Sequence, residues 1–220
     1  MFEKHRAKQL EAAYAVDHAR WAQDRDDLAQ QVATARDFAG DPSGQGLVLK
    51  QGESLYAAVT SVSLIEERRT GGHWQSGSHG VSIPVGSLGG HAVRYRVGAT
   101  RGHYVQGTPT PTAIDNGTAY VTDQRVVFTG SAQSRECRFD KLLTCTPGSG
   151  CMTFSVSNRQ KPTTIAYGAE LDGWFGFRLT LALAHFRGDV ATMVGQLEGQ
   201  LAALDAAEPA PPPATPRPDA

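Results

Sequence analysis

The sequence has no long apolar run. No stretch approaches the roughly 20 consecutive apolar residues that a membrane-spanning helix needs, and no apolar segment follows the basic residues at the N-terminus as in a secretory signal. Only three cysteines are present (Cys137, Cys145 and Cys151), and their spacing fits neither a zinc motif nor a disulfide framework. We therefore predict a cytoplasmic protein with reduced thiols.

The net charge is also small, at -1 for the 220 residues. The whole surface of the protein is therefore not expected to bind polyanions. The distribution is less even. Residues 91–161 hold nine Lys and Arg against four Asp and Glu, whereas residues 162–208 hold two against six. Two interpretations stay open: the two regions complement each other inside the fold, or the basic region binds an external anion.

Catalytic motifs are missing as well. There is no G-x-x-x-x-G-K-[ST] phosphate loop. The segment 76–80 (Ser-Gly-Ser-His-Gly) lacks the first glycine of a G-x-S-x-G nucleophile elbow. The cysteines have no adjacent histidine that would favour a thiolate, so buried structural thiols are the better interpretation. We therefore predict no enzymatic activity and no cofactor.

What the chain does contain begins with a helical segment at residues 1–39. It has no glycine or proline before residue 40 and is rich in Ala, Gln, Glu and Arg. Tyr14, Trp21 and Leu28 recur every seven residues, a thin stripe that favours a short coiled coil, self-association or docking on a protein partner. The alternative is a helix packed on its own domain. Residues 40–46, rich in glycine, predict a short flexible linker.

Residues 47–205 predict one mainly β domain. Short β-branched and apolar runs divided by Gly, Pro, Asn or Asp are typical of a barrel or sandwich. Two such runs at 117–130 flank Asp123-Gln124 and predict a β-hairpin. Residues 71–112 are rich in Gly and Ser and indicate an insertion or an elaborated hairpin.

The domain ends with a predicted helix at 173–205, where apolar residues recur every three or four positions. Gly188, Gly195 and Gly199 interrupt it, and we expect them to allow close packing on the sheet. The remaining residues, 206–220, are rich in Ala and Pro and predict a disordered tail.

Many short strands followed by a long amphipathic helix resemble the pleckstrin-homology-like (PH-like) fold. The segment 117–130 resembles the GRAM and bacterial PH pattern, in which a strand ends in Thr-(Asn/Asp)-x-Arg and resumes as an apolar-x-Phe strand. The matching residues are Tyr120, Thr122, Asp123, Arg125 and Phe128. The resemblance points to an actinobacterial family without an assigned activity, so it implies a β-barrel or sandwich capped by a helix, and no chemistry.

PH-like modules commonly bind lipids, peptides or proteins. The resemblance therefore implies a non-catalytic interaction or scaffold module that recognises a protein or an anionic group, such as a lipid head group or a phosphate. Contact with a peripheral anionic membrane surface fits this hypothesis. Nucleic acid is not favoured, because aromatic residues are not interleaved with the cations. The candidate anion-binding or partner-binding residues are Arg94, Arg96, Arg135, Arg138, Lys141, Arg159 and Lys161.

The rival hypothesis is a small enzyme, or a ligand or metal carrier, that uses the stretch 71–107. This stretch carries four histidines (His73, His79, His91 and His103). Their spacings of six, twelve and twelve residues match no metal-ligand motif, so solvent-exposed or structural histidines are the alternative.

Overall fold

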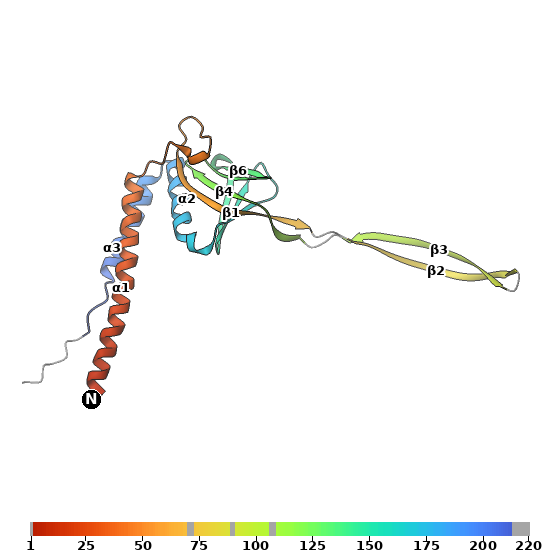
Figure 1. Cartoon of the computed structure of the whole chain (residues 1–220), viewed down its shortest axis with the longest axis horizontal. Helices are drawn as coiled ribbons and strands as arrows, with labels where there is room; N and C mark the ends of the chain where they lie inside the picture. Colours follow the sequence, from red (N-terminus) through yellow and green to blue (C-terminus); the bar gives the residue numbers. More distant parts are fainter. Residues whose placement is uncertain (1, 70–72, 89–90, 106–108, 213–220) are drawn as a thin grey trace, which may run out of the picture.

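The computed structural model describes the backbone of residues 2–69, 73–88, 91–105 and 109–212; the side chains of residues 69–109 lie outside the description (Figure 1). The helices are α1 (Phe2–Asp37), α2 (Asp172–Arg187) and α3 (Val190–Ala206), with 3₁₀ turns at Gly44–Gly46, Phe139–Lys141 and Ala169–Leu171. The strands are β1 (Leu55–Arg69), β2 (His73–Leu88), β3 (His91–Val105), β4 (Pro109–Thr122), β5 (Arg125–Gly130), β6 (Ser134–Arg138), β7 (Leu142–Gly148), β8 (Cys151–Val156) and β9 (Thr163–Ala166).

Seven strands form one antiparallel sheet in the order β6-β5-β4-β1-β9-β8-β7, and the described chain is mixed α/β. The long strand β1 pairs with β4 on one side and β9 on the other. Its backbone is irregular at Ser61, which has a φ of 59° and lies between Val59 and Val62, where the register with β4 shifts. Bulges of this kind bend a strand and increase its twist.

The sequence predicted a β-barrel or sandwich capped by a helix. A barrel is not confirmed, because the seven-stranded sheet is open, with β6 and β7 as its edge strands. A side chain, rather than a strand pairing, spans part of the gap. Arg159, in the loop between β8 and β9, donates to the carbonyl of Glu136 in β6 at 3.5 Å and to Oγ1 of Thr163 at 2.6 Å.

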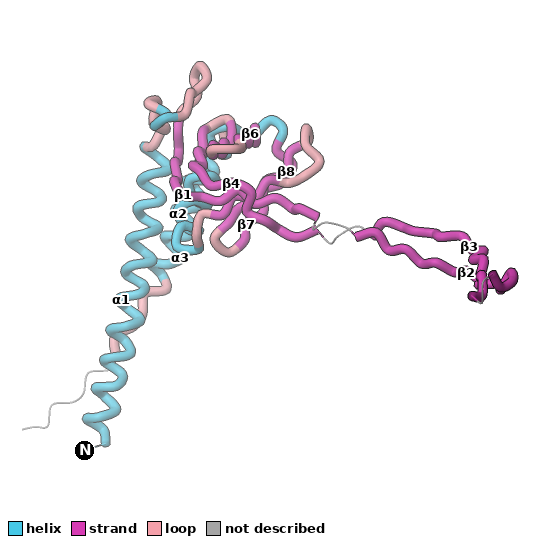
Figure 2. Tube along the Cα trace, turned by 45° about the vertical axis from the view of Figure 1, so that its right-hand side comes forward, coloured by secondary structure: helices cyan, strands magenta, loops and turns pink. Residues whose placement is uncertain are grey.

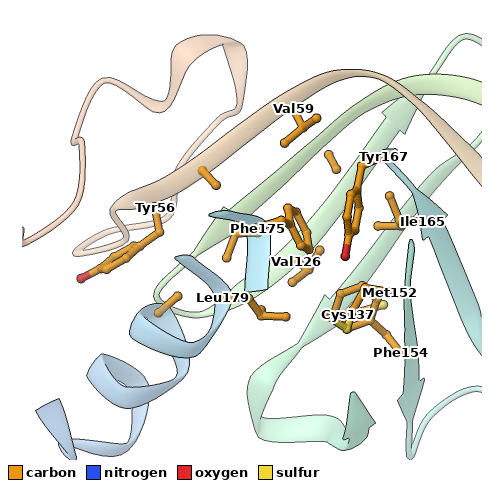
Figure 3. Packing of buried hydrophobic residues seen from close by; sticks show 14 of the residues in the cluster. Tyr56, Val59, Val126, Cys137, Met152, Phe154, Ile165, Tyr167, Phe175 and Leu179 are labelled. Carbon is orange, nitrogen blue, oxygen red and sulfur yellow. The ribbon is translucent and has the colours of Figure 1, made fainter. Parts of the chain in front are cut away.

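The core lies between the concave face of the sheet and α2 (Figure 3). In β8 the alternation is strict: Met152, Phe154 and Val156 are buried, while the residues between them are only partly so. Phe175 of α2 is fully buried and stacks on Tyr167, with ring centroids 4.4 Å apart. The buried side chains, every second residue along β8 and those on the apolar face of α2, thus pack in a single core.

The predicted hairpin at 117–130 is confirmed. Strand β4 pairs with β5 from Gly117 opposite Gly130 to Val121 opposite Val126. A Cβ atom at Gly117 would collide with the carbonyl oxygen of Thr129, so this position requires glycine for close approach.

The region predicted as an elaboration contains a second sheet made of β2 and β3 alone, which extends away from the body of the molecule as an arm (Figures 1 and 2). Strands β1 and β4 lead toward it and pair as far as Arg69 opposite Pro109. Strand β4 therefore begins inside the region that the sequence assigned to the elaboration.

The predicted single helix at 173–205 is two helices. Gly188 ends α2 in the left-handed conformation (φ 75°, ψ 21°), which glycine adopts without a Cβ penalty. The interpretation of Gly188, Gly195 and Gly199 as close-packing positions is wrong, because a Cβ at any of them would meet nothing within 4 Å. Helix α2 covers the sheet, whereas α3 turns away from it.

Helix α3 packs antiparallel on the C-terminal half of α1 (Figures 1 and 2). The indole nitrogen of Trp21 donates to the carbonyl of Leu204 at 2.8 Å. Arg25 pairs with Asp205 at 2.8 Å, and Arg36 pairs with Glu198. Val32 and Ala35 of α1 are buried in the core cluster. This half of α1 is therefore part of the fold of its own chain.

The predicted linker at 40–46 is fully described, whereas the predicted tail at 206–220 is described only in part. Within 40–46, Asp41 forms a β-bridge with Leu55, Gly44 is buried and a 3₁₀ turn follows, so the segment is anchored to β1. In the predicted disordered tail, the last turn of α3 includes Ala206, while residues 213–220 lie outside the described residues.

Candidate functional site: the Phe186 patch

Arg125, one of the residues that match the GRAM-like pattern, forms a buried ion pair with Glu53. Arg125 donates from Nε and Nη2 to the two carboxylate oxygens of Glu53 at 2.7 and 2.9 Å. The side chains of Arg125 and Glu53 are 10% and 0% exposed. Nη2 of Arg125 also donates to the carbonyl of Val48 at 3.0 Å.

Thr122 and Asp123 add two further hydrogen bonds between the hairpin and the loop before β1. The Thr122 hydroxyl donates to Glu53 at 2.7 Å, and the carboxylate of Asp123 accepts from the Ser54 backbone at 3.0 Å. Burial alone would raise the pKa of Glu53, but hydrogen bonds from Arg125, the Lys50 backbone and Thr122 together hold it below its usual value. These groups tie the hairpin to the loop before β1.

Three of the cations predicted from the sequence donate hydrogen bonds to groups of their own chain. Arg135 donates to Glu66 at 2.8 and 2.5 Å. Arg159 spans the gap beside β6, as described above. Lys161 donates to the carbonyl of Glu67 at 3.4 Å. All three bind groups of their own chain, but none of them pairs with an acidic residue of 162–208, so these bonds are not the predicted complementarity between the two regions.

The other predicted residues fall into two groups. Arg138 and Lys141 lie together on the connection from β6 to β7, where both are exposed and share Asp140. Arg94 and Arg96 belong to β3, and their side chains lie outside the description.

The four histidines lie on the arm, and their side chains are likewise outside the description. Backbone register places His73 opposite Val105 and His103 opposite Gln75, near one end. His79 lies opposite Ala99, and His91 is at the other end, opposite Leu88. Strand rise is about 3.3 Å per residue, so the backbone separates His91 from His73 by roughly 50 Å along the arm. Among the described side chains, no group of three or more His, Cys, Asp or Glu could hold a metal ion.

Arg138 and Lys141 border a surface that sequence reasoning did not identify, which we call the Phe186 patch. Two large apolar side chains are exposed there: Phe186 at the end of α2 (43%) and Leu143 in β7 (66%). Phe186 lies between two hollows. One, of about 250 Å³, is lined by Leu143, Arg187 and neighbours from β7 and α2. The other, of about 310 Å³, is lined by Lys50, Gln124, Arg138, Asp140 and Phe186.

Four cations lie at or beside these hollows: Lys50 and Arg138 line one, Arg187 lines the other, and Lys141 lies next to Asp140. Arg138 makes a two-point contact with Asp140 at 2.9 Å for both nitrogens, and Lys141 lies 3.9 Å from the same carboxylate. The bond from Arg138 holds the pKa of Asp140 below its usual value. Lys50 pairs with Glu136, at 2.9 Å. Arg187 has no hydrogen bond or ion pair within the described part of the chain. Two carboxylates against four cations leave the patch with a net charge of +2.

The signal for this patch in the sequence was weak. Phe186 continues the apolar stripe of α2, so the pattern indicates a core position. It is nevertheless 43% exposed, one residue before the end of α2 at Arg187. Its ring still contacts buried Phe139 edge-on, with centroids 5.7 Å apart.

Two of the cysteines, Cys137 and Cys145, offer little reactivity. Burial raises the pKa of Cys137, and burial with the neighbouring Cys137 raises the pKa of Cys145 to about 11. At neutral pH these thiols are protonated and therefore poor nucleophiles.

No protein-family model, curated protein or solved structure matches this chain. Within the described residues, no helix is both long enough and apolar enough to cross a bilayer.

Proposed function

We propose that this chain is a non-catalytic interaction module of the cytoplasm, built on a PH-like scaffold, that docks on an anionic membrane surface through the Phe186 patch. The observation that carries the proposal is the combination of exposed Phe186 and Leu143 with four cations at or beside the two hollows. Apolar insertion together with basic side chains is the usual design of reversible membrane anchors.

The order of strands and helices supports the PH-like scaffold. If the arm is treated as an insertion, seven antiparallel strands precede α2, and β1 joins the two halves of the sheet by pairing with β4 and β9. This is the order that the resemblance implies. The open edges distinguish the molecule from a closed barrel.

The magnitudes suit a weak, reversible anchor. Complete burial of a Phe or Leu side chain is worth about 1.5–3 kcal/mol, and roughly half of that remains available to side chains that are already partly covered. Each Lys or Arg near an anionic leaflet adds about 1 kcal/mol, and salt screens this contribution. The apolar and the basic contributions are thus similar in size, and loss of either should be measurable.

Co-sedimentation with vesicles tests the proposal. We expect binding to phosphatidylcholine vesicles containing phosphatidylserine, weaker binding as salt rises, and little binding to phosphatidylcholine alone. Lys141→Gln with Arg187→Gln should weaken binding roughly 30-fold, as expected for two cations at about 1 kcal/mol each. Leu143→Ser with Phe186→Ser should weaken it about tenfold.

Matched changes elsewhere serve as controls. Lys8→Gln with Arg20→Gln removes the same charge from exposed positions of α1, and Leu10→Ser with Val16→Ser removes exposed apolar side chains. Both should leave vesicle binding unchanged when it is measured at protein concentrations below those at which the chain self-associates. The proposal fails if the wild-type chain does not bind anionic vesicles at low salt, or if the α1 variants lose as much binding as the patch variants.

A further inference from the structure

A second cavity lies between α1 and α2, away from the residues of the Phe186 patch. Its volume is about 310 Å³. Its lining combines polar side chains from α1 with aromatic side chains and an arginine from α2: Asp27, Gln30, Gln31, Thr34, Gly173, Trp174, Phe177 and Arg178. This volume is at the lower end of small-molecule sites.

Arg178 is the unusual member of this lining. Its Nε and Nη1 atoms are buried and have no hydrogen-bond partner among the described residues. The guanidinium carbon lies 4.4 Å from the ring centre of Phe38 and 5.9 Å from that of Trp174. Aromatic faces attract a cation, but any N–H···π contact is weaker than the hydrogen bonds that these two atoms could donate to an oxygen.

The charge of Arg178 is not balanced locally. The nearest carboxylate of the lining, Asp27, is exposed and accepts from Gln23 at 2.9 Å, and it forms no ion pair with Arg178 within the described part of the chain. Asp172, in the first turn of α2, accepts instead from the Gly150 backbone at 3.0 Å. Burial without a counter-ion lowers the pKa of Arg178.

The rest of the lining matches an acidic group with an apolar body. The side chains of Gln30, Gln31 and Thr34 make no hydrogen bond to the described residues, so their amide and hydroxyl groups are available to a ligand. Trp174 and Phe177 supply apolar walls. One cation beside the carboxylate of Asp27 balances a single negative charge better than the double charge of a phosphate.

We propose that the cavity between α1 and α2 binds a small monocarboxylate with an apolar body, and that Arg178 is its counter-ion. The ligand carboxylate would accept from the guanidinium, which would shift toward the cavity to present the donors that are now buried. The apolar body would lie against Trp174 and Phe177. This site does not depend on the membrane proposal.

The test uses 3-phenylpropanoate as the probe, with its neutral amide and phenyl phosphate as matched compounds, titrated by calorimetry against the full chain. We expect the carboxylate to bind at least about tenfold more tightly than the amide, because only the carboxylate pairs with Arg178. Stronger binding of phenyl phosphate would overturn the assignment to a monocarboxylate. Equal binding of amide and carboxylate would overturn the role of Arg178.

Two further variants separate binding from folding. Gln31→Glu places a carboxylate of the chain itself in the cavity; it should raise the melting temperature and weaken probe binding about tenfold, whereas Gln31→Met should change binding by less than about threefold. Arg178→Met should abolish binding without lowering the melting temperature, because it removes a buried, unpartnered charge. Retained binding in Arg178→Met or in Gln31→Glu would refute the proposal. Leu143→Ser with Phe186→Ser should bind the probe normally, which distinguishes failure of this site from failure of the Phe186 patch.

Discussion

Among the described residues, Glu53 and Arg125 are the only charged ones whose exposure falls below a tenth, at 4% and 9%. A buried ion pair adds little net stability relative to an apolar pair, but removal of one partner leaves the other charge buried without compensation. The pair therefore acts as a constraint on structure. It joins the hairpin at 117–130 to the loop before β1, and we infer that it favours this arrangement over others.

We predict that Glu53→Gln lowers the free energy of unfolding by about 3–5 kcal/mol, measured by urea denaturation at pH 7. Glu67→Gln, at an exposed position of β1, should change it by less than about 0.5 kcal/mol. The pKa of Glu53 is lowered from its ordinary value of 4.5, so its contribution is present above that pH and is lost as pH falls through the folded-state pKa. The difference in the free energy of unfolding between the wild type and Glu53→Gln should therefore become smaller at acid pH. A loss below about 1 kcal/mol at pH 7 would contradict the argument.

The sequence predicted a turn at Asp123-Gln124, and the side chains of Asp123 and Arg125 both anchor the hairpin to the loop before β1. Sequence reasoning could not find their partners. Glu53 lies 72 positions before Arg125 in an irregular loop, and no periodicity connects the two. Local patterns are visible along a sequence because their residues are near neighbours, whereas a partner at this distance is selected only by the folded chain.

At the scale of elements, the boundary between α2 and α3 depends on one residue. Gly188 has a φ of 75°, and the space around it is empty, so the only penalty of a side chain there is conformational. Gly195 lies within α3, exposed and equally unobstructed. These two glycines therefore form a matched pair with opposite expected effects.

We predict that Gly188→Ala lowers the free energy of unfolding by about 1 kcal/mol, because alanine is strained in the left-handed region. Gly195→Ala should raise it by up to about 1 kcal/mol, because alanine favours a helix interior. Urea denaturation of both variants beside the wild type provides the measurement. Stabilisation by Gly188→Ala would mean that α2 and α3 can continue as one helix, as the sequence alone predicted.

The elements themselves were largely predictable, and their pairing was not. Short runs divided by Gly, Pro, Asn or Asp indicated the strands of the domain, and the Asp123-Gln124 break identified the turn between β4 and β5. The position of β1 between β4 and β9 leaves no local trace, since it depends on contacts across about a hundred residues. The exposure of Phe186 was missed for a similar reason, because a stripe of apolar residues does not show where the surface that covers it ends.

At the scale of the molecule, α1 has two different halves. The hydrogen bonds and ion pairs that join it to α3 and the residues after it begin at His18, while Leu10 and Val16 are exposed at 48% and 60%. The C-terminal half is already occupied within the chain. Any self-association through residues 1–39 would therefore use the N-terminal half.

We expect the full chain to self-associate through this N-terminal half, and a chain that begins at Asp17 to be monomeric with a nearly unchanged melting temperature. Sedimentation velocity and thermal denaturation of both proteins provide the measurement. The trimmed chain keeps Trp21, Arg25 and Val32, so it retains the contacts with α3. If both proteins sediment as monomers, self-association through residues 1–39 is refuted.

The antiparallel pairing of α1 and α3 also determines how the molecule would respond to mechanical load. The contacts run from His18 with Glu208, through Trp21 with Leu204 and Arg25 with Asp205, to Arg36 with Glu198. Both ends of the described chain lie beyond the same end of this series. Tension between them would open the helices like a zipper, one contact at a time, instead of shearing all contacts together. The sheet, the Phe186 patch and the arm would feel such a force only after the two helices had separated.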